Sequence, residues 1–167
     1  MIRLTPGCAF GTGEHSTTRM CLNIIERELR AGSSILDVGT GSGILAIGAR
    51  LSGAAMVVAI DTDPEAVATA SRNALINDSG DLMLVAGGLE ALRGDRRFDI
   101  VVANITGAAL VRLMNPLCTI ASRTLILSGI LSEEETEVVA AARSNGFDVT
   151  AREGDDWVAL TLNRFPA

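Results

Sequence analysis

The sequence predicts an α/β fold with a doubly wound, mainly parallel sheet of seven strands, and three observations lead to this prediction. Short apolar runs alternate with segments of helical periodicity along most of the 167 residues. A glycine-rich turn, residues 39–43, follows the first buried run and opens a helix. The last two apolar runs, 147–152 and 157–163, are joined by a short acidic turn and form an antiparallel hairpin. We expect this C-terminal hairpin to place a reversed strand at the edge of the sheet.

Local patterns define each element. The apolar positions of residues 17–30 keep a helical period, and Gly32 ends that helix. Residues 63–65, Asp-Pro-Glu, predict a helix start, because they combine an N-cap acid, a proline in the first turn and an acid near the positive end of the helix dipole. Ser132 is the expected N-cap of a helix whose first turn is acidic. The expected helices are 17–30, 43–51, 64–77, 108–120 and 133–144, and the expected strands are 34–38, 55–60, 81–85, 98–103, 124–127, 147–152 and 157–163.

The composition argues against several classes of function. Hydrophobic residues make up 48% of the chain and charged residues 20%, which suits one globular domain over residues 1–167. The net charge of −6, the lack of a basic run and the scarcity of aromatic residues argue against direct nucleic-acid binding. No apolar run is long enough to span a membrane. Three separated cysteines and one histidine give no metal-binding spacing, and they indicate reduced thiols in a cytoplasmic protein.

The glycine turn and an acid after the second strand predict a nucleoside site. Gly39, Gly41 and Gly43 allow a tight turn and the close approach of a ligand to the backbone, although a turn without a ligand would need the same residues. Asp61 lies 22 residues after Gly39 at the end of the second strand, where an acid accepts hydrogen bonds from ribose hydroxyls. Asp63 is more simply explained as an N-cap. We expect the ligand beyond the carboxyl ends of the strands, at the switch point beside the first strand.

The spacing and charge of this site favour S-adenosylmethionine over a dinucleotide. A dinucleotide site places its third glycine one residue later and its pyrophosphate at the helix N-terminus, where Asp37 would be poorly placed. S-adenosylmethionine carries an ammonium group, a sulfonium and a ribose diol but no phosphate. An acid before the turn, Asp37, and an acid after the next strand, Asp61, therefore suit it better. Asp37 could instead cap a neighbouring loop.

Five stretches of the chain carry a family resemblance. Residues 35–46 and 59–64 resemble class I S-adenosylmethionine-dependent methyltransferases, and residues 6–18, 102–105 and 127–131 resemble the PrmA family. This resemblance covers nearly the whole chain. It implies a Rossmann-like methyltransferase fold, S-adenosylmethionine as the cofactor, and N-methylation of lysine and α-amino groups in a ribosomal protein.

The same resemblance implies the residues of the site. It gives cofactor contacts to Thr18, Gly39, Asp61 and Asn104, and weaker ones to Phe10, Gly11, Gly41 and Ile105. Asn104 ends the fourth expected strand, and we take it as the catalytic residue because its amide can orient a substrate amine. Simpler explanations are that Asn104 is a turn residue and that Thr18 belongs to the first helical turn. We expect residues 1–31 to cover the cofactor site, with 7–15 as a lid ordered by His15.

The methyl acceptor stays open. PrmA proteins carry a separate N-terminal recognition domain, whereas this chain begins almost at the catalytic loop. A protein amine, in a ribosomal protein or another protein, is the main expectation. The alternatives are a small-molecule N- or O-methyltransferase and a cofactor-binding subunit that needs a partner. A nicotinamide-dependent oxidoreductase is disfavoured by the glycine spacing and by the lack of a Tyr-Lys pair.

Overall fold

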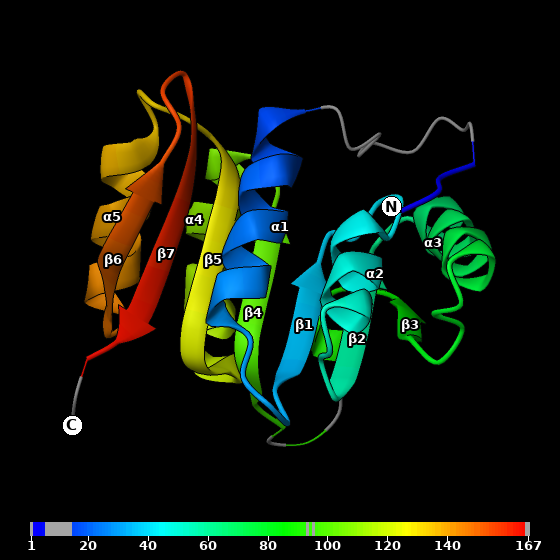
Figure 1. Cartoon of the computed structure of the whole chain (residues 1–167). Helices are drawn as coiled ribbons and strands as arrows, with labels where there is room; N and C mark the ends of the chain where they lie inside the picture. Colours follow the sequence, from blue (N-terminus) through cyan, green and yellow to red (C-terminus); the bar gives the residue numbers. More distant parts are fainter. Residues whose placement is uncertain (1, 6–14, 93, 95, 166–167) are drawn as a thin grey trace.

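Seven strands form one sheet in the order β3-β2-β1-β4-β5-β7-β6, with helices on both faces (Figure 1). The computed structural model describes residues 2–5, 15–92, 94 and 96–165. The strands are β1 (Ser34–Val38), β2 (Met56–Asp61), β3 (Met83–Ala86), β4 (Phe98–Asn104), β5 (Ala121–Leu131), β6 (Phe147–Glu153) and β7 (Trp157–Arg164). The helices are α1 (Ser16–Glu28), α2 (Ile44–Leu51), α3 (Pro64–Ile76), α4 (Gly107–Ile120) and α5 (Glu135–Ser144), with a 3-10 helix η1 (Leu89–Ala91). The predicted doubly wound, mainly parallel sheet is confirmed.

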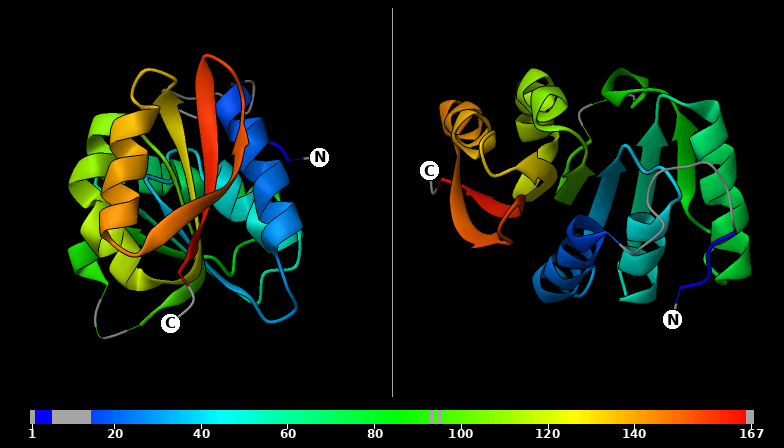
Figure 2. Two further views of the ribbon diagram at one scale, coloured as in Figure 1. Left: turned by 90° about the vertical axis from the view of Figure 1, so that its left-hand side faces the viewer. Right: turned by 90° about the horizontal axis from the view of Figure 1, so that it is seen from above.

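The central strands send alternate side chains into two cores. In β4, Ile100 and Val102 lie in the core under α1 and α2, whereas Val101 and Ala103 lie in the core under α4 and α5. Figure 2 shows these two helical layers on opposite faces of the sheet. Such double burial explains why the central strands are nearly continuous apolar runs. In the described ranges, no helix is both long and apolar enough to cross a membrane.

The reversed strand lies inside the sheet, so the prediction of a reversed edge strand is wrong. β7 runs antiparallel to β5 on one side and to β6 on the other, which makes β6 the edge. Apolar residues of β7 are fully buried, namely Val158, Ala159, Leu160 and Leu162. A strand buried in this way belongs between two neighbours, whereas β6 is only partly buried. β5 is longer than the expected 124–127, because β7 pairs with it from Thr124 to Leu131.

The predicted start of α3 is confirmed. The Asp63 carboxylate accepts a hydrogen bond from the Glu65 N–H at 2.9 Å, and Pro64 occupies the first helical position. This cap fixes the direction in which the chain leaves β2. The residues that follow the second strand are therefore held at the carboxyl edge of the sheet.

The predicted cap of the last helix is wrong. Ser132 lies in a turn, where its N–H donates to the Asp156 carbonyl at 3.0 Å, and α5 begins at Glu135 after Glu134 as the N-cap. The Glu134 carboxylate accepts instead from the N–H of Leu131 at 3.0 Å. Because β5 continues to Leu131 and its following turn is tied to the β6–β7 connection, the helix starts later than the sequence pattern indicates.

Candidate functional site

The carboxyl ends of β1 and β4 lie side by side at the switch point of the sheet. Val38 pairs with Ala103 in the parallel register, so Gly39 and Asn104 follow at neighbouring positions. β2 lies on the other side of β1, and the chain reaches it through α2. Ligands of doubly wound sheets bind in the crevice at this point. The topology thus brings two of the predicted site residues to one edge.

Gly39 is held in a position that only glycine fits. Its φ is 73°, in the left-handed region, and an added Cβ would lie 2.5 Å from Cγ2 of Ile105. The N–H groups of Gly39 and Thr40 both donate to the Ile60 carbonyl, at 2.9 and 3.0 Å. Gly39 and Ile105 are therefore in contact. Part of the glycine requirement comes from the fold itself, as the tight-turn explanation states.

Asp61 connects the end of β2 to the glycine turn. Its Oδ2 accepts a hydrogen bond from the Gly41 N–H at 3.0 Å, and its Oδ1 accepts one from the Asp63 N–H at 3.0 Å. Each carboxylate oxygen can accept a further hydrogen bond, and the residue is only half-buried. The Asp61 carboxylate therefore holds the turn in place and keeps acceptor capacity for ligand hydroxyls.

Asp37 is a buried acid with an unsatisfied oxygen. The residue is 1% exposed, and its Oδ2 accepts a hydrogen bond from the Thr40 hydroxyl at 2.6 Å. Its Oδ1 has no hydrogen-bond partner among the described residues. Burial raises the pKa of Asp37 to about 6, against the opposing effect of the hydrogen bond from Thr40. The bond to Thr40 fits a loop-capping role, whereas the unsatisfied oxygen and the raised pKa fit an acid near a positively charged ligand group.

The amide of Asn104 is held by the first turn of α1. Its Nδ2 donates to the Thr17 hydroxyl at 3.3 Å. Thr18 is buried, and its N–H donates to the His15 carbonyl at 3.2 Å, so Thr18 belongs to the first helical turn. The side chain that meets Asn104 is therefore the neighbour of the predicted residue Thr18.

Sequence reasoning missed two side chains near Asn104, namely Thr17 and Trp157. His15 caps α1, and its Nδ1 lies 2.7 Å from the Thr17 hydroxyl oxygen. The His15 ring also meets the Trp157 ring edge-to-face, with centroids 5.1 Å apart and an interplanar angle of 80°. A polar run at a helix start was the available signal for Thr17. Trp157 comes from the last strand, and no local pattern points to it.

Gly129 supports the segment after β4 and was also missed. Its φ is 78°, and an added Cβ would lie 2.4 Å from the Ile105 carbonyl oxygen. The Ile105 N–H donates to the Ser128 carbonyl at 3.1 Å. Gly129 lies beyond the expected strand 124–127 but inside the observed β5, where a glycine marks such a close backbone approach. Two further predicted residues, Phe10 and Gly11, lie outside the described residues.

The chemistry at this edge comes from carboxylates, an amide and hydroxyls. In the part of the chain that the structure describes, no group of three or more His, Cys, Asp or Glu side chains could hold a metal ion. Burial raises the pKa of the Cys21 thiol to about 12 and that of the Cys118 thiol to about 11. These two thiols therefore stay protonated at neutral pH and are poor nucleophiles.

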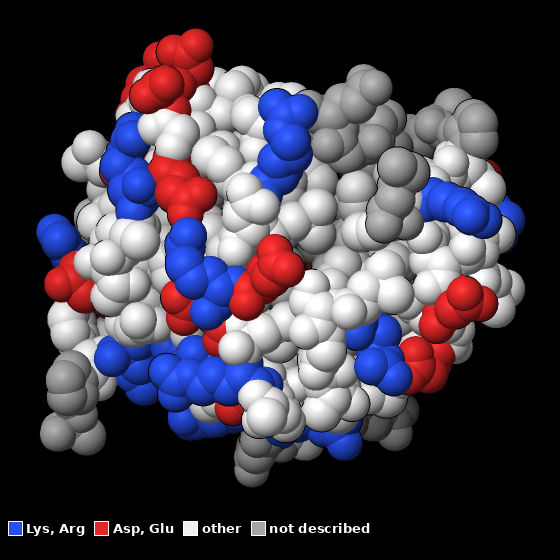
Figure 3. Space-filling view, in the orientation of Figure 1, with Lys and Arg blue, Asp and Glu red and all other residues white. Residues whose placement is uncertain are grey.

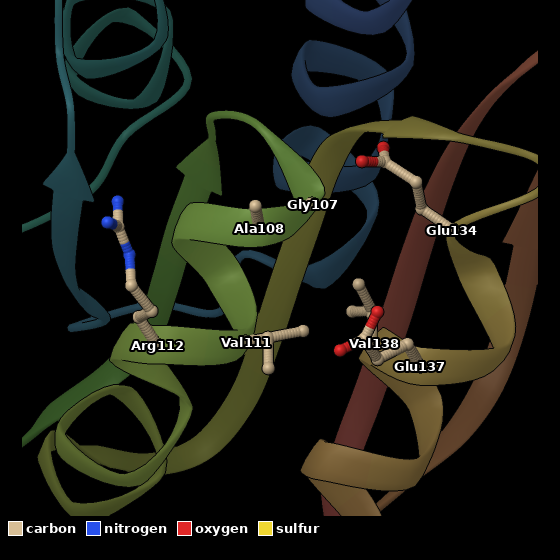
Figure 4. Close-up of a pocket in the computed structure, with 7 residues that line it drawn as sticks. All are labelled: Gly107, Ala108, Val111, Arg112, Glu134, Glu137 and Val138. Atoms are coloured by element: carbon tan, nitrogen blue, oxygen red, sulfur yellow. The ribbon is translucent and has the colours of Figure 1, made fainter.

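A cleft of about 330 Å³ lies between the first turns of α4 and α5 (Figure 4). Its apolar walls come from both helices, since Val111 points toward Val138, while Arg112 points away from α5. The residues that line it are Gly107, Ala108, Val111, Arg112, Glu134, Glu137 and Val138. Because this lining includes none of the predicted site residues, the cleft is separate from the switch point.

Comparison with known sequences identifies one family. Residues 1–164 match the model of the family described as ribosomal protein L11 methyltransferase (PrmA). A ribosomal protein L11 methyltransferase from Thermotoga petrophila is 41% identical over 167 residues, which cover 98% of this chain and 62% of the relative. One from Pelobacter propionicus is 45% identical over 175 residues, which cover 98% of this chain and 55% of the relative. The chain thus spans between about half and two thirds of the length of these relatives.

Solved structures agree with this result. A crystal structure of ribosomal protein L11 methylase from Lactobacillus delbrueckii subsp. bulgaricus matches with a TM-score of 0.90 and 36% identity, and the match covers 98% of this chain and 84% of that chain. Magnesium protoporphyrin IX methyltransferase from Synechocystis PCC 6803, with bound SAM, matches with a TM-score of 0.74 and 19% identity, over 88% of this chain and 79% of that chain. At that identity the likeness concerns the fold, which is the predicted methyltransferase fold.

Proposed function

Because the chain belongs to the PrmA family of ribosomal protein L11 methyltransferases, we propose that it transfers a methyl group from S-adenosylmethionine to a protein amine. One observation carries the proposal: the glycine turn, the Asp61 carboxylate and the Asn104 amide share one edge of the sheet. A carboxylate and a glycine turn without side chains are typical of nucleoside sites. The neighbouring side-chain amide can form hydrogen bonds with an amine. A single crevice could therefore hold both reactants.

The residues at this edge fit S-adenosylmethionine group by group. Asp61 would accept hydrogen bonds from the ribose hydroxyls, since each of its oxygens keeps acceptor capacity. Asp37, whose Oδ1 lacks a partner among the described residues, would balance the ammonium group. Gly39 and Gly41 let a ligand approach the backbone. Further cofactor contacts, proposed from the family resemblance, come from Phe10, Gly11, Thr18, Asn104 and Ile105.

The chain must orient a neutral amine and exclude water. The bound cofactor would supply a methyl group carried on a sulfonium, and the demethylated cofactor would then be a neutral thioether. A lysine amine has a pKa near 10.4, so deprotonating it at pH 7 costs roughly 4–5 kcal/mol, and burial lowers that cost. The Oδ1 atom of Asn104 would accept one N–H of the amine and direct its lone pair toward the methyl group.

We further propose that the acceptor is a basic protein. The carboxyl edge carries acidic turns at residues 133–135 and 155–156, and acidic side chains gather at the top left of Figure 3. The net charge of the chain is −6. An acidic rim attracts a cationic partner and speeds its encounter. This edge thus suits lysine-rich proteins better than nucleic acid or an anionic membrane. The reaction would take place in the cytoplasm, in line with the lack of a disulfide pattern.

Residues 1–167 would form a single domain, with residues 1–31 over the cofactor site. α1 supports this arrangement because it packs against β4, β5 and β7, on the sheet beside the switch point. Its first turn also reaches Asn104 through Thr17. A cover at this position would exclude water from the strand ends.

The test is transfer of a tritium-labelled methyl group from S-adenosylmethionine to recombinant ribosomal protein L11 of Thermotoga petrophila, the source of one of the relatives. We expect label in the protein, and mass spectrometry should place it on lysine or α-amino groups. Calorimetry on the same preparation measures cofactor affinity. Cofactor binding without transfer to protein, but with label in small molecules of a cell lysate, would contradict a protein acceptor. No cofactor binding would contradict the methyltransferase function itself.

A further inference from the structure

The orientation of the Asn104 amide depends on a contact behind it. An asparagine amide can face a ligand with its oxygen or with its NH2 group. Here Nδ2 lies 3.3 Å from the Thr17 hydroxyl oxygen, on the side of α1. If the hydroxyl accepts this hydrogen bond, the amide oxygen becomes the group available to a ligand. The position of the Thr17 proton therefore determines which face Asn104 presents.

His15 sets the direction in which the Thr17 hydroxyl donates its hydrogen bond. The Nδ1 atom of His15 lies 2.7 Å from the Thr17 hydroxyl oxygen, and the Thr17 N–H also points to Nδ1 at 3.4 Å. The Thr17 N–H can only donate, so we infer that Nδ1 carries a lone pair, that the imidazole proton lies on Nε2, and that the Thr17 hydroxyl donates to Nδ1. A hydroxyl has only one proton. Since that proton is donated to His15, the oxygen can only accept from Asn104.

Burial fixes this arrangement. Thr17 is 3% exposed, so its hydroxyl has to make its hydrogen bonds inside the protein. The His15 ring is held by its edge-to-face contact with Trp157 and by its place as the N-cap of α1. Residues from α1, β4 and β7 together therefore fix the orientation of the Asn104 amide.

We propose that Thr17 is a positioning residue, which together with His15 turns the oxygen of Asn104 toward the methyl acceptor. This inference rests on the proposed function, in which Asn104 accepts an N–H of a neutral amine. If the Asn104 amide were rotated by 180°, its NH2 group would face the N–H groups of the acceptor amine. No hydrogen bond could then orient the lone pair of the amine nitrogen toward the methyl group. His15 acts through Thr17 and does not itself take the amine proton.

The tautomer of His15 tests the inference without cofactor or acceptor. His15 is the only histidine, so its ring nitrogen signals in a 15N NMR spectrum are unambiguous. We expect the Nε2–H tautomer in the wild type. Thr17→Val removes the donor and should give a mixture of tautomers, whereas Thr17→Ser should keep the wild-type form. An Nδ1–H tautomer in the wild type would overturn the inference.

Kinetics with labelled cofactor and ribosomal protein L11 test the consequence. Thr17→Val should lower kcat about tenfold, with the KM for the cofactor changed less than about twofold, and Thr17→Ser should rescue most of the turnover. Thr161→Val is the matched control, because Thr161 is also buried and its hydroxyl has no partner among the described residues. An unchanged kcat in Thr17→Val beside an active wild type would refute the role of Thr17. An inactive wild type would instead contradict the proposed function.

Two variants of His15 separate positioning from catalysis. His15→Phe keeps a ring against Trp157 but lacks the acceptor, so kcat should fall about as far as in Thr17→Val. His15→Asn keeps an acceptor near the position of Nδ1 and is a good N-cap, so it should rescue turnover. Rescue over the whole pH range would support positioning. Equal losses in both variants would show that the imidazole itself takes part in the reaction, and would overturn the inference.

Discussion

Two aspartates on neighbouring strands show how differently the two ends of this sheet are built. Asp99, at the amino end of β4, accepts hydrogen bonds from the N–H and the hydroxyl of Ser34, both at 2.8 Å, and these bonds lower its pKa. Asp37, at the carboxyl end of β1, keeps an oxygen without a partner among the described residues, and burial raises its pKa to about 6. The fold satisfies the charge of Asp99, whereas the charge of Asp37 can be satisfied by a ligand.

The basic residues follow the same division. Arginines gather along the lower part of Figure 3, where the amino ends of the parallel strands lie. There Arg164 donates to the carbonyls of Cys118 and Ala121, and Arg123 lies 3.6 Å from Glu28. These arginines therefore bind groups of the protein itself and stabilise the fold. The carboxyl edge instead places the Asp37 and Asp61 carboxylates beside the glycine turn, and Oδ1 of Asp37 has no partner there among the described residues.

Gly39→Ala is expected to have the largest effect on this comparison. The new Cβ would meet Ile105 at 2.5 Å in a left-handed backbone, so unfolding free energy should fall by about 2–5 kcal/mol. Displacement of Ile105 should also weaken cofactor binding. Gly32→Ala is the matched control, because Gly32 has a φ of 82° and open space around its Cβ position. It should lose only about 1–2 kcal/mol, measured by chemical denaturation. Equal losses in the two variants would show that the carboxyl edge is not tightly packed.

Asp37→Asn and Asp99→Asn should change the pH dependence of stability in opposite directions. A carboxyl whose folded pKa is raised binds protons more tightly in the folded state, so Asp37 lowers stability as pH rises from about 4 to about 6. The difference between 3.8 and about 6 corresponds to about 3 kcal/mol, and Asp37→Asn should remove that slope. Saturating S-adenosylmethionine should reduce the slope in the wild type.

Asp99 should give a slope of stability against pH of the opposite sign. Its lowered pKa means that the unfolded state binds protons more tightly, so Asp99 stabilises the fold above pH 3.8 and loses this effect as pH falls further. Asp99→Asn should therefore destabilise the protein at neutral pH and leave cofactor affinity unaltered. Urea titrations at several pH values measure both slopes. Slopes of the same sign for the two aspartates would contradict the division between the two ends of the sheet.

Asp61→Ala should weaken cofactor binding about 10–100-fold, because hydrogen bonds to charged groups contribute about 1.5–3 kcal/mol. The loss includes the contact with Gly41, which orders the turn in the absence of a ligand. Asp81→Ala is the control, since Asp81 is exposed and forms an ion pair with Arg50 at 2.8 Å. Calorimetry should show wild-type affinity for that control. Unchanged affinity in Asp61→Ala would remove Asp61 from the cofactor site.

The predictable parts of this protein were those encoded locally. The turn at residues 39–43 is predictable because its three glycines adopt the left-handed conformation that other residues rarely adopt. The Asp63 cap is predictable because the capping carboxylate and the N–H that it accepts from lie only two residues apart. The contact between Thr17 and Asn104 joins residues 87 positions apart, and no local pattern reports it. The insertion of β7 between β5 and β6 is likewise a non-local pairing, which a hairpin motif leaves undetermined.

Arg123→Ala should have the smallest effect and so tests the amino edge. The ion pair between Arg123 and Glu28 is partly exposed, and such pairs contribute about 0.2–1 kcal/mol. Arg123 also donates to the Glu28 carbonyl at 3.1 Å, at the last residue of α1, so its loss should loosen that end of the helix. The first turn of α1, which holds Asn104 through Thr17, lies at the opposite end of the helix. Cofactor affinity and kcat should therefore match the wild type. A fall in kcat would show that α1 transmits the state of the amino edge to the site, and that the two ends of the sheet are coupled.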